Sequence, residues 1–311
     1  MHEISLAYFS MEIALASPIP TYSGGLGVLA GDTLRSAADA GLPMAGITLL
    51  SRQGYFRQRL DDQGRQTEEP VRWPVDDYLL PEPVEAEVEI EDRKVRIRAW
   101  RYEIQGIGGH VVPVYLLDTD VEGNSDYDRS LTDRLYGGDT YYRLCQEVIL
   151  GIGGIRILRA LGHTETRRYH MNEGHSSLLV LELLSELSRQ QAIPRICEKE
   201  IEQIRRQCVF TTHTPVASGH DRFPITLAAR VLKQCAVFDE CAEHFCSDDE
   251  LNLTFLALFA SHYINGVAKR HRVTSMRLFE GYQIDSITNG IHAHTWSSDA
   301  MCALFDSHIP D

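Results

Sequence analysis

A glycine cluster near the amino terminus has the residue types needed to bind an anion. Ser23-Gly24-Gly25-Leu26-Gly27 precedes residues 33–40, a run with helical spacing. Glycine has no Cβ, so a ligand can approach the backbone closely, and the first N–H groups of a helix have no acceptor within that helix. We therefore expect phosphate or a phosphorylated ligand at this loop.

Two other interpretations of the glycine cluster stay open. Gly25, Gly27 and Ala30 fit a loose form of the dinucleotide-binding fingerprint. That fingerprint needs its glycines directly after a strand, whereas Pro18 and Pro20 intervene here, and no acidic residue for a ribose follows the next strand candidate. The cluster could instead be a tight turn that packs a helix against a sheet.

Polar residues follow the other strand candidates in the same way. Runs at residues 4–9, 169–172, 207–212 and 285–288 are followed, in that order, by Glu12, by Glu173 with His175, by His213 and by Asn289. The carboxyl ends of parallel strands line one crevice, so these residues are expected to converge there. A mixture of amide, imidazole and carboxylate groups suits a hydroxyl-rich ligand such as a sugar. A single histidine at a strand end is commonly structural, but several such residues together favour a functional site.

Metal binding and glycoside hydrolysis are alternative uses of these side chains. Three histidines could hold zinc, but the close pair His292-x-His294 would project to opposite faces of an extended strand. We therefore predict no metal site. Glu12 and Glu173 could form a glycosidase pair, although the sequence does not fix the carboxylate separation on which that mechanism depends.

The elements around these residues have an α/β pattern. Residues 4–9, the helix that ends near Gly41 and residues 43–50 form a β-loop-α-β unit, which predicts a parallel sheet. Residues 84–118 alternate with a period of two and predict an inserted antiparallel β meander with cross-strand charge pairs. Residues 134–161 have helical spacing interrupted by Gly151, Gly153 and Gly154, which we attribute to close helix packing. Residues 251–269 are predicted to form a helix.

Composition narrows the classes of partner. The 311 residues carry a net charge of -14, which disfavours nucleic acid and anionic membranes as partners because both need clustered Lys and Arg. No apolar run approaches the ~20 residues of a membrane span, and no signal peptide is recognisable. The seven cysteines lack C-x-x-C spacing and are predicted to be reduced core residues of a cytoplasmic protein.

Eight segments, in the same order along the chain, resemble the α-glucan (glycogen and maltodextrin) phosphorylases, particularly their shorter bacterial and archaeal form. They are AYFSME at 7–12, YSGGLGVLAGD at 22–32, RQGYFRQ at 52–58, DRLYGGD at 133–139, QEVILGIGG at 146–154, NEGHS at 172–176, THTP at 212–215 and TNGIH at 288–292. The resemblance implies a GT-B glycosyltransferase, in which the whole chain, residues 1–311, is the Rossmann-like amino-terminal domain with residues 84–118 as the inserted meander.

The resemblance also implies an activity and residue roles. The family performs reversible phosphorolysis of an α-1,4-glucan to glucose 1-phosphate with retained configuration, and pyridoxal phosphate assists through its phosphate group. By this resemblance the catalytic residue is His213, through its backbone carbonyl, and Gly25 faces the cofactor phosphate. The residues implied to bind substrate are Gly24, Gly25, Leu26, Glu173, His175, Val267 and Asn289.

The family's second domain should begin soon after Trp296, whereas the sequence ends at Asp311. The second domain supplies the lysine that binds pyridoxal phosphate, and none of Lys94, Lys199, Lys233 and Lys269 matches it. We therefore expect that domain to be absent, and the chain alone to bind no cofactor and to be inactive unless a separate carboxyl-terminal chain completes it. Self-association is an alternative that the sequence leaves open. A non-catalytic glucan-binding or regulatory protein is the alternative, and a nucleotide-sugar glycosyltransferase is a third interpretation.

Overall fold

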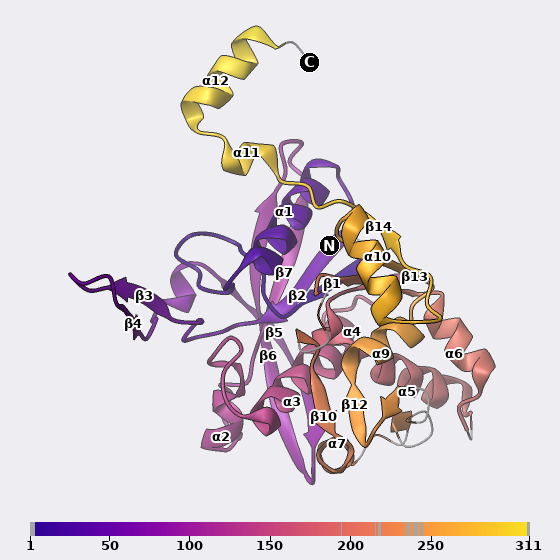
Figure 1. Cartoon of the computed structure of the whole chain (residues 1–311). Coiled ribbons are helices and arrows are strands. Elements are labelled where there is room, and N and C mark those ends of the chain that lie inside the picture. Colours follow the sequence, from indigo (N-terminus) through magenta and orange to yellow (C-terminus); the bar gives the residue numbers. More distant parts are fainter. Residues whose placement is uncertain are drawn as a thin grey trace.

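The centre of the protein is a nine-stranded sheet (Figure 1). The computed structural model describes residues 4–193, 195–214, 216, 219–233, 235, 237–238, 242 and 245–309. Pro215 of the THTP motif and Cys241 lie outside these residues. The strands, in order across the sheet, are β14 (Asp285–Ser286), β13 (Tyr263–Gly266), β9 (Cys208–Thr212), β8 (Arg168–Asn172), β1 (Leu6–Ser10), β2 (Met44–Leu49), β7 (Val111–Asp118), β6 (Arg93–Gln105) and β5 (Leu80–Ile90).

The strands from β14 to β7 are all parallel, as the β-loop-α-β pattern predicts. Successive side chains of a strand point to opposite faces of the sheet, and both faces of this part are buried. In β1, Tyr8 packs in one core cluster with Leu34 of helix α1 (Gly25–Asp39). Phe9 packs in the other with Leu144 of helix α3 (Thr140–Val148). The predicted fold class, a parallel sheet flanked by helices, is confirmed.

The predicted antiparallel meander is also confirmed. Strands β5, β6 and β7 pair antiparallel in sequence, and β7 also pairs parallel with β2, so the meander extends the central sheet. It begins at residue 80, four residues before the predicted start. Glu87 lies opposite Arg96 and within 3.2 Å of Lys94, which are the expected cross-strand charge pairs.

The glycines of residues 134–161 produce both a break and close packing. Between α3 and α4 (Gly154–Ala160) the chain forms a π-helical segment, Ile149–Gly153. A Cβ on Gly151 would lie 2.6 Å from the backbone nitrogen of Leu179, and one on Gly154 would lie 2.6 Å from the Phe9 ring. Side chains at these positions would therefore hold the helix away from the sheet and from helix α5 (Leu179–Gln191).

The prediction of one helix over residues 251–269 is wrong. The chain forms β12 (Glu250–Asn252), the short helix α9 (Leu253–Phe259) and then β13. Asn252 caps α9 by accepting hydrogen bonds from Thr254 and Phe255. Apolar periodicity alone did not separate the helix from the strand, because β13 is buried between β9 and β14 and lacks an alternating pattern.

Further elements surround the sheet. A small sheet contains β10 (Arg222–Pro224), β11 (Cys246–Ser247) and β12, and an exposed hairpin contains β3 (Arg57–Leu60) and β4 (Gln66–Glu69). The other helices are α2 (Asp126–Arg129), α6 (Glu198–Arg205), α7 (Ile225–Val231), α10 (Lys269–Leu278), α11 (Ala293–Trp296) and α12 (Asp299–His308). Figure 1 shows the hairpin and the α11–α12 segment projecting from the body, and α12 has no buried residue.

The described cysteines correct one prediction. Six are unpaired, and Cys145 and Cys208 are buried, as expected for core residues. Cys197 is exposed at the start of α6, and Cys302 lies in α12, which has no buried residue, so neither is a core residue. None of the helices in the described part of the chain combines the length and the apolar character of a membrane span.

Candidate functional site

The sheet order places five predicted residues at the ends of five neighbouring parallel strands. Asn289 follows β14, Val267 follows β13, His213 follows β9, Glu173 follows β8 and Glu12 follows β1. The expectation that Glu12, Glu173, His213 and Asn289 follow parallel strands at one sheet edge is confirmed, and Val267 lies at the same edge. The carboxyl edge of a parallel sheet is where α/β proteins commonly bind their ligands.

Glu12 is bound to the glycine loop. Its side chain is buried, and Oε2 accepts hydrogen bonds from the backbone N–H of Ser23 at 2.6 Å and of Gly24 at 3.1 Å. We expected N–H donors of this loop to bind an anionic ligand, and Glu12 binds two of them instead. The carboxylate therefore holds the loop before any ligand is present.

The glycine loop still has backbone donors at the start of helix α1. The helix begins at Gly25, so the N–H groups of Gly25, Leu26 and Gly27 belong to its first turn and have no acceptor within the helix. The space around Gly24 and Gly25 is open, because a Cβ on either residue would meet no atom within 4 Å, whereas a Cβ on Gly27 would lie 2.6 Å from Tyr22 Cβ. Open glycines beside free N–H donors fit a phosphate group.

Tyr136 is the second contact of Glu12. Its hydroxyl donates to Glu12 Oε1 at 2.9 Å, although the two residues are far apart in sequence. Burial and the nearby Glu12 charge raise the pKa of the Tyr136 hydroxyl, so it remains a donor at neutral pH. Tyr136 has φ of +56°, an uncommon backbone conformation for a residue with a side chain. It was not predicted as a site residue.

Glu173 and His213 are joined through the backbone. Oε1 of Glu173 accepts hydrogen bonds from the N–H groups of His213 and of Thr214, the latter at 2.8 Å. Glu173 itself has φ of +68° and is buried. The Glu173 carboxylate thus fixes the direction of the chain, and of the His213 carbonyl, as it leaves β9.

The imidazole of His213 is also fixed. Nε2 lies 2.5 Å from Oδ1 of Asn172, and Nδ2 of Asn172 donates to Ser10 Oγ at 3.0 Å. Burial lowers the pKa of His213, so the ring is neutral near pH 7 and Nε2 is the protonated nitrogen that donates to Asn172.

Val267 and Asn289 meet at the other end of this edge. The backbone N–H of Asn289 donates to the carbonyl of Val267 at 3.1 Å, and the N–H of Val267 donates to Nδ1 of His271 at 3.1 Å. Burial lowers the pKa of His271, which leaves Nδ1 free to accept. The Asn289 side chain is exposed.

His175 belongs to a charged cluster that sequence reasoning missed. Nε2 of His175 lies 3.2 Å from Oδ2 of Asp221, and the same oxygen accepts from Arg143 at 2.9 Å. Arg143 also donates through Nε to Glu147 Oε1 at 3.0 Å. Burial alone would raise the pKa of Asp221, but the hydrogen bond and charge of His175 and the charge of Arg143 lower it below its usual value.

The pKa of Glu147 is shifted in the opposite direction to that of Asp221. Glu147 is fully buried, and burial together with the charge of Asp221 raises its pKa well above the usual value despite Arg143. Its Oε2 has no hydrogen-bond partner among the described residues. A charged pair at i and i+4 inside an otherwise apolar run was the available sequence signal for Arg143 and Glu147.

This cluster faces a cavity, which we call the cleft cavity. It has a volume of about 410 Å³ and is lined by residues 136–140, Arg143, Asp221, Arg222 and Phe223. Tyr136 connects it to the glycine loop, because its hydroxyl holds Glu12 and its ring lies 5.8 Å from that of His175. Peptide, carboxylate and guanidinium groups around one hollow can orient a polyol through many hydrogen bonds.

The alternative sites receive no support from this geometry. Both carboxyl oxygens of Glu12 accept hydrogen bonds within the chain, which disfavours Glu12 as the proton donor of a glycosidase. Within the described part of the chain, no group of three or more His, Cys, Asp or Glu side chains has an arrangement that could hold a metal ion.

Known proteins with similar sequences include maltodextrin and glycogen phosphorylases. The chain is 37% identical to the maltodextrin phosphorylase of Thermococcus litoralis over 99% of its own length and 38% of that protein. It is 37% identical to the glycogen phosphorylase of Mycobacterium tuberculosis over 96% of its length and 38% of that protein. An uncharacterized protein of Methanocaldococcus jannaschii is 31% identical over 95% of the chain and 54% of that protein. No protein-family model matches the chain.

These similarities confirm the relationship to the α-glucan phosphorylase family. The chain corresponds to the amino-terminal part of such a protein and spans 38% of the length of the two phosphorylases named above. Its mostly parallel sheet with flanking helices is consistent with a GT-B amino-terminal domain.

Proposed function

We propose that the chain forms the amino-terminal half of an α-1,4-glucan phosphorylase site, which converts glucan and phosphate to glucose 1-phosphate with retained configuration. The observation that supports this most directly is that Glu12, Glu173, His213, Val267 and Asn289 follow five neighbouring parallel strands at one sheet edge. The residues come from five strands, so a local motif alone does not account for their proximity.

Each residue has a role in this proposal. The N–H groups of Gly25 and Leu26 bind phosphate oxygens at the start of α1, and the open space beside Gly24 admits them. The carbonyl of His213, whose direction Glu173 fixes, stabilises positive charge that develops on the glucosyl carbon.

The sugar contacts complete the assignment. Asn289 and Val267 face glucose hydroxyls, and His175, held by Asp221, faces the glucan. The cleft cavity, lined by Tyr136 and Arg143, receives the glucan chain.

Pyridoxal phosphate is the cofactor that the family implies. The residues of this chain fit its phosphate group, since Gly25 offers an N–H donor with no side chain in the way. When bound, the cofactor supplies a phosphate that exchanges a proton with the substrate phosphate. Its covalent attachment needs a lysine, which we assign to a carboxyl-terminal half, either on a separate chain or on one continuous with this one. We place the assembly in the cytoplasm.

A fusion protein tests this proposal. Residues 4–296 are joined to the carboxyl-terminal part of the Thermococcus litoralis maltodextrin phosphorylase and supplied with maltoheptaose, phosphate and pyridoxal phosphate. We expect glucose 1-phosphate from the fusion and none from the 311-residue chain alone. In the fusion, Gly25→Val should abolish activity because it fills the phosphate space, whereas Gly108→Val, at another open glycine, should not.

The outcomes separate the candidate functions. Glucose 1-phosphate from the 311 residues alone would overturn the assignment of the lysine to another half. A folded but inactive fusion that binds maltoheptaose tightly would favour the non-catalytic glucan-binding protein. Binding of a nucleotide sugar in place of glucan would favour the nucleotide-sugar glycosyltransferase.

A further inference from the structure

A second cavity lies on the other side of the Tyr136 loop, and we call it the hairpin cavity. It has a volume of about 440 Å³, within the usual range for small-molecule sites. Its lining includes Gln53, Tyr55, Phe56, Glu68, Arg134 and Tyr136. Tyr136 and Gly137 line both this cavity and the cleft cavity, so the two hollows are neighbours separated by one loop.

Paired backbone segments hold lining residues of the hairpin cavity in place, because Gly54, between Gln53 and Tyr55, is bonded to the Arg134–Leu135 segment. Gly54 and Arg134 form a parallel bridge, and Leu135 donates its N–H to the carbonyl of Gly54 at 3.0 Å. Gly54 has φ of +61° and lies against Pro20, where a Cβ would be 2.8 Å from the Pro20 side chain. Only glycine therefore fits at position 54, and its backbone bonds fix the chain beside the cavity.

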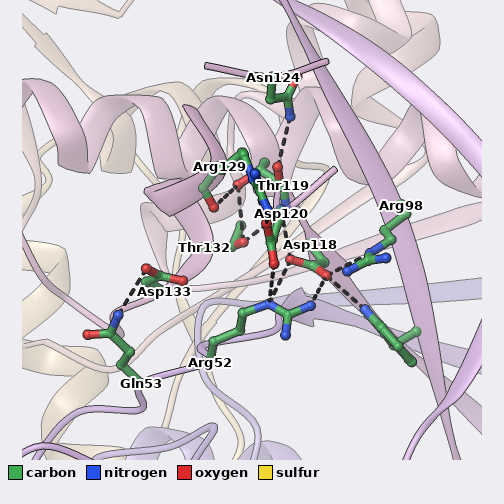
Figure 2. A network of polar contacts seen from close by, with 11 residues as sticks. Arg52, Gln53, Arg98, Asp118, Thr119, Asp120, Asn124, Arg129, Thr132 and Asp133 are labelled. Atoms are coloured by element: carbon green, nitrogen blue, oxygen red, sulfur yellow. Dashed lines mark hydrogen bonds and ion pairs between the residues drawn. The ribbon is translucent and has the colours of Figure 1, made fainter. Parts of the chain in front are cut away.

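A charged network holds the chain segment at Arg52 and Gln53, next to the lining of the cavity (Figure 2). Buried Asp118 accepts hydrogen bonds from Arg52 at 2.5 Å, from Arg98 at 2.8 Å and from Trp100 at 2.9 Å. Gln53, next to Arg52, donates to Asp133 at 3.0 Å. Figure 2 shows Arg52 and Gln53 held between Asp118 on one side and Asp133 on the other. The cavity is thus formed before a ligand binds, which reduces the entropic cost of ordering its side chains on binding.

The lining combines aromatic faces with planar polar groups. The rings of Tyr55 and Phe56 are 4.1 Å apart and tilted by 34°, and Tyr55 is 45% exposed. Arg134 donates through Nε to Gln53 Oε1 at 3.2 Å, which uses one of the five N–H donors of a guanidinium. Aromatic faces beside amide and guanidinium groups suit a pyranose, whose C–H face is apolar and whose edge carries hydroxyls.

The charged side chains of the lining favour a neutral ligand. Two carboxylates, Glu68 and Glu69, and one guanidinium, Arg134, belong to the lining. Glu69 pairs with Arg59 at 3.0 Å, so the remaining charges of the lining, Glu68 and Arg134, balance each other and give phosphate, a sugar phosphate or a nucleotide no net attraction. A neutral oligosaccharide has hydroxyl groups that can donate to carboxylates and accept from the guanidinium.

We propose that the hairpin cavity is an accessory subsite that binds α-glucan residues of the same chain whose neighbouring residues occupy the cleft cavity. The inference rests on the proposed function, because it takes the glucan from there. Because Tyr136 and Gly137 line both cavities, we expect one oligosaccharide to cross this loop from one cavity to the other. The subsite therefore favours long glucans over short ones.

Saturation-transfer NMR on the 311-residue chain, which detects weak binding, tests the subsite with maltotriose and maltoheptaose. We expect maltoheptaose to bind more tightly than maltotriose. Tyr55→Ala should weaken maltoheptaose binding about two- to tenfold, the usual worth of one aromatic contact, and should leave maltotriose binding nearly unchanged. Tyr78→Ala is the matched control, because Tyr78 is 40% exposed and packs on Trp73 outside the cavity. Circular dichroism verifies that both variants fold.

The possible failures are distinct. If neither oligosaccharide binds to the chain, the inference fails, whereas the fusion protein decides the proposed function separately. If both bind and Tyr55→Ala has no more effect on maltoheptaose than Tyr78→Ala, the subsite alone is overturned. Equal affinity for maltotriose and maltoheptaose in the unaltered chain would overturn it as well.

Discussion

The guanidinium of Arg143 lies over the ring of Tyr136, with the central carbon 4.6 Å from the ring centre. Arg143 also bonds Asp221 and Glu147, and Tyr136 bonds Glu12. This pair therefore connects the charged cluster around His175 to the glycine loop. Attraction between a cation and an aromatic face is stronger in a partly buried site than at the surface.

Replacement of Arg143 by methionine should strongly destabilise the fold. The Arg143 side chain is 13% exposed, and its loss leaves the buried Asp221 carboxylate without its guanidinium and Glu147 Oε1 without a donor. Breaking a buried ion pair costs about 3–5 kcal/mol, which urea unfolding would measure. Arg206→Met is the control, because Arg206 is 75% exposed and its pair with Glu202 should contribute at most about 1 kcal/mol. Similar losses from both variants would contradict the role of Arg143.

Tyr136→Phe should loosen the glycine loop. The change removes the hydroxyl that donates to Glu12 Oε1 and leaves that oxygen unpaired. We expect a loss of about 1–3 kcal/mol and faster amide hydrogen exchange at Ser23 and Gly24, whose N–H groups bond the same carboxylate. Tyr127→Phe, a change at a residue that is 44% exposed, should leave these two amides unchanged. Unaltered amide exchange at Ser23 and Gly24 in Tyr136→Phe would show that the Tyr136 hydroxyl does not hold the loop.

Sequence reasoning located the edge of the sheet but not the contacts within it. Short apolar runs with polar residues after them predict parallel strands and the position of Glu12, Glu173 and His213, because both features are local. The bond between Arg143 and Asp221 joins residues 78 positions apart, and no local pattern encodes such a contact. The binding of Ser23 and Gly24 by Glu12 was missed for a related reason, since the sequence of an anion-binding loop does not indicate whether the anion is a ligand or a side chain.

The strand β13 shows a different limit. Tyr263–Gly266 follows the apolar helix α9 after only a few residues, and buried strands have continuous rather than alternating apolar character. The whole stretch therefore resembled one helix. Pairing with β9 and β14 decides the strand, and that pairing depends on residues far along the chain.

Glu147→Gln should change the pH dependence of stability. Because the folded-state pKa of Glu147 is raised, folding favours its protonated form, and stability is lost as pH rises above the unfolded value of about 4.3. Glutamine has no such ionisation, so the free energy of unfolding of the variant relative to the unaltered protein should increase with pH above that value. Urea unfolding between pH 4.5 and pH 8 would measure this, with the exposed Glu122→Gln as control. A difference that does not depend on pH would refute a protonated Glu147.

Gly151→Ala should destabilise the protein although alanine is the better helix former. A methyl group at this position would lie 2.6 Å from the Leu179 nitrogen and 2.9 Å from the Leu178 carbonyl carbon, and backbone atoms cannot move aside as a flexible side chain can. Overpacking costs typically about 1–3 kcal/mol, which exceeds the gain of about 1 kcal/mol in helix propensity for most of that range. Gly108→Ala has no atom within 4 Å and should leave the melting temperature nearly unchanged. A more stable Gly151→Ala would mean that α5 can shift away from the π-helical segment and that the glycine is not required by packing.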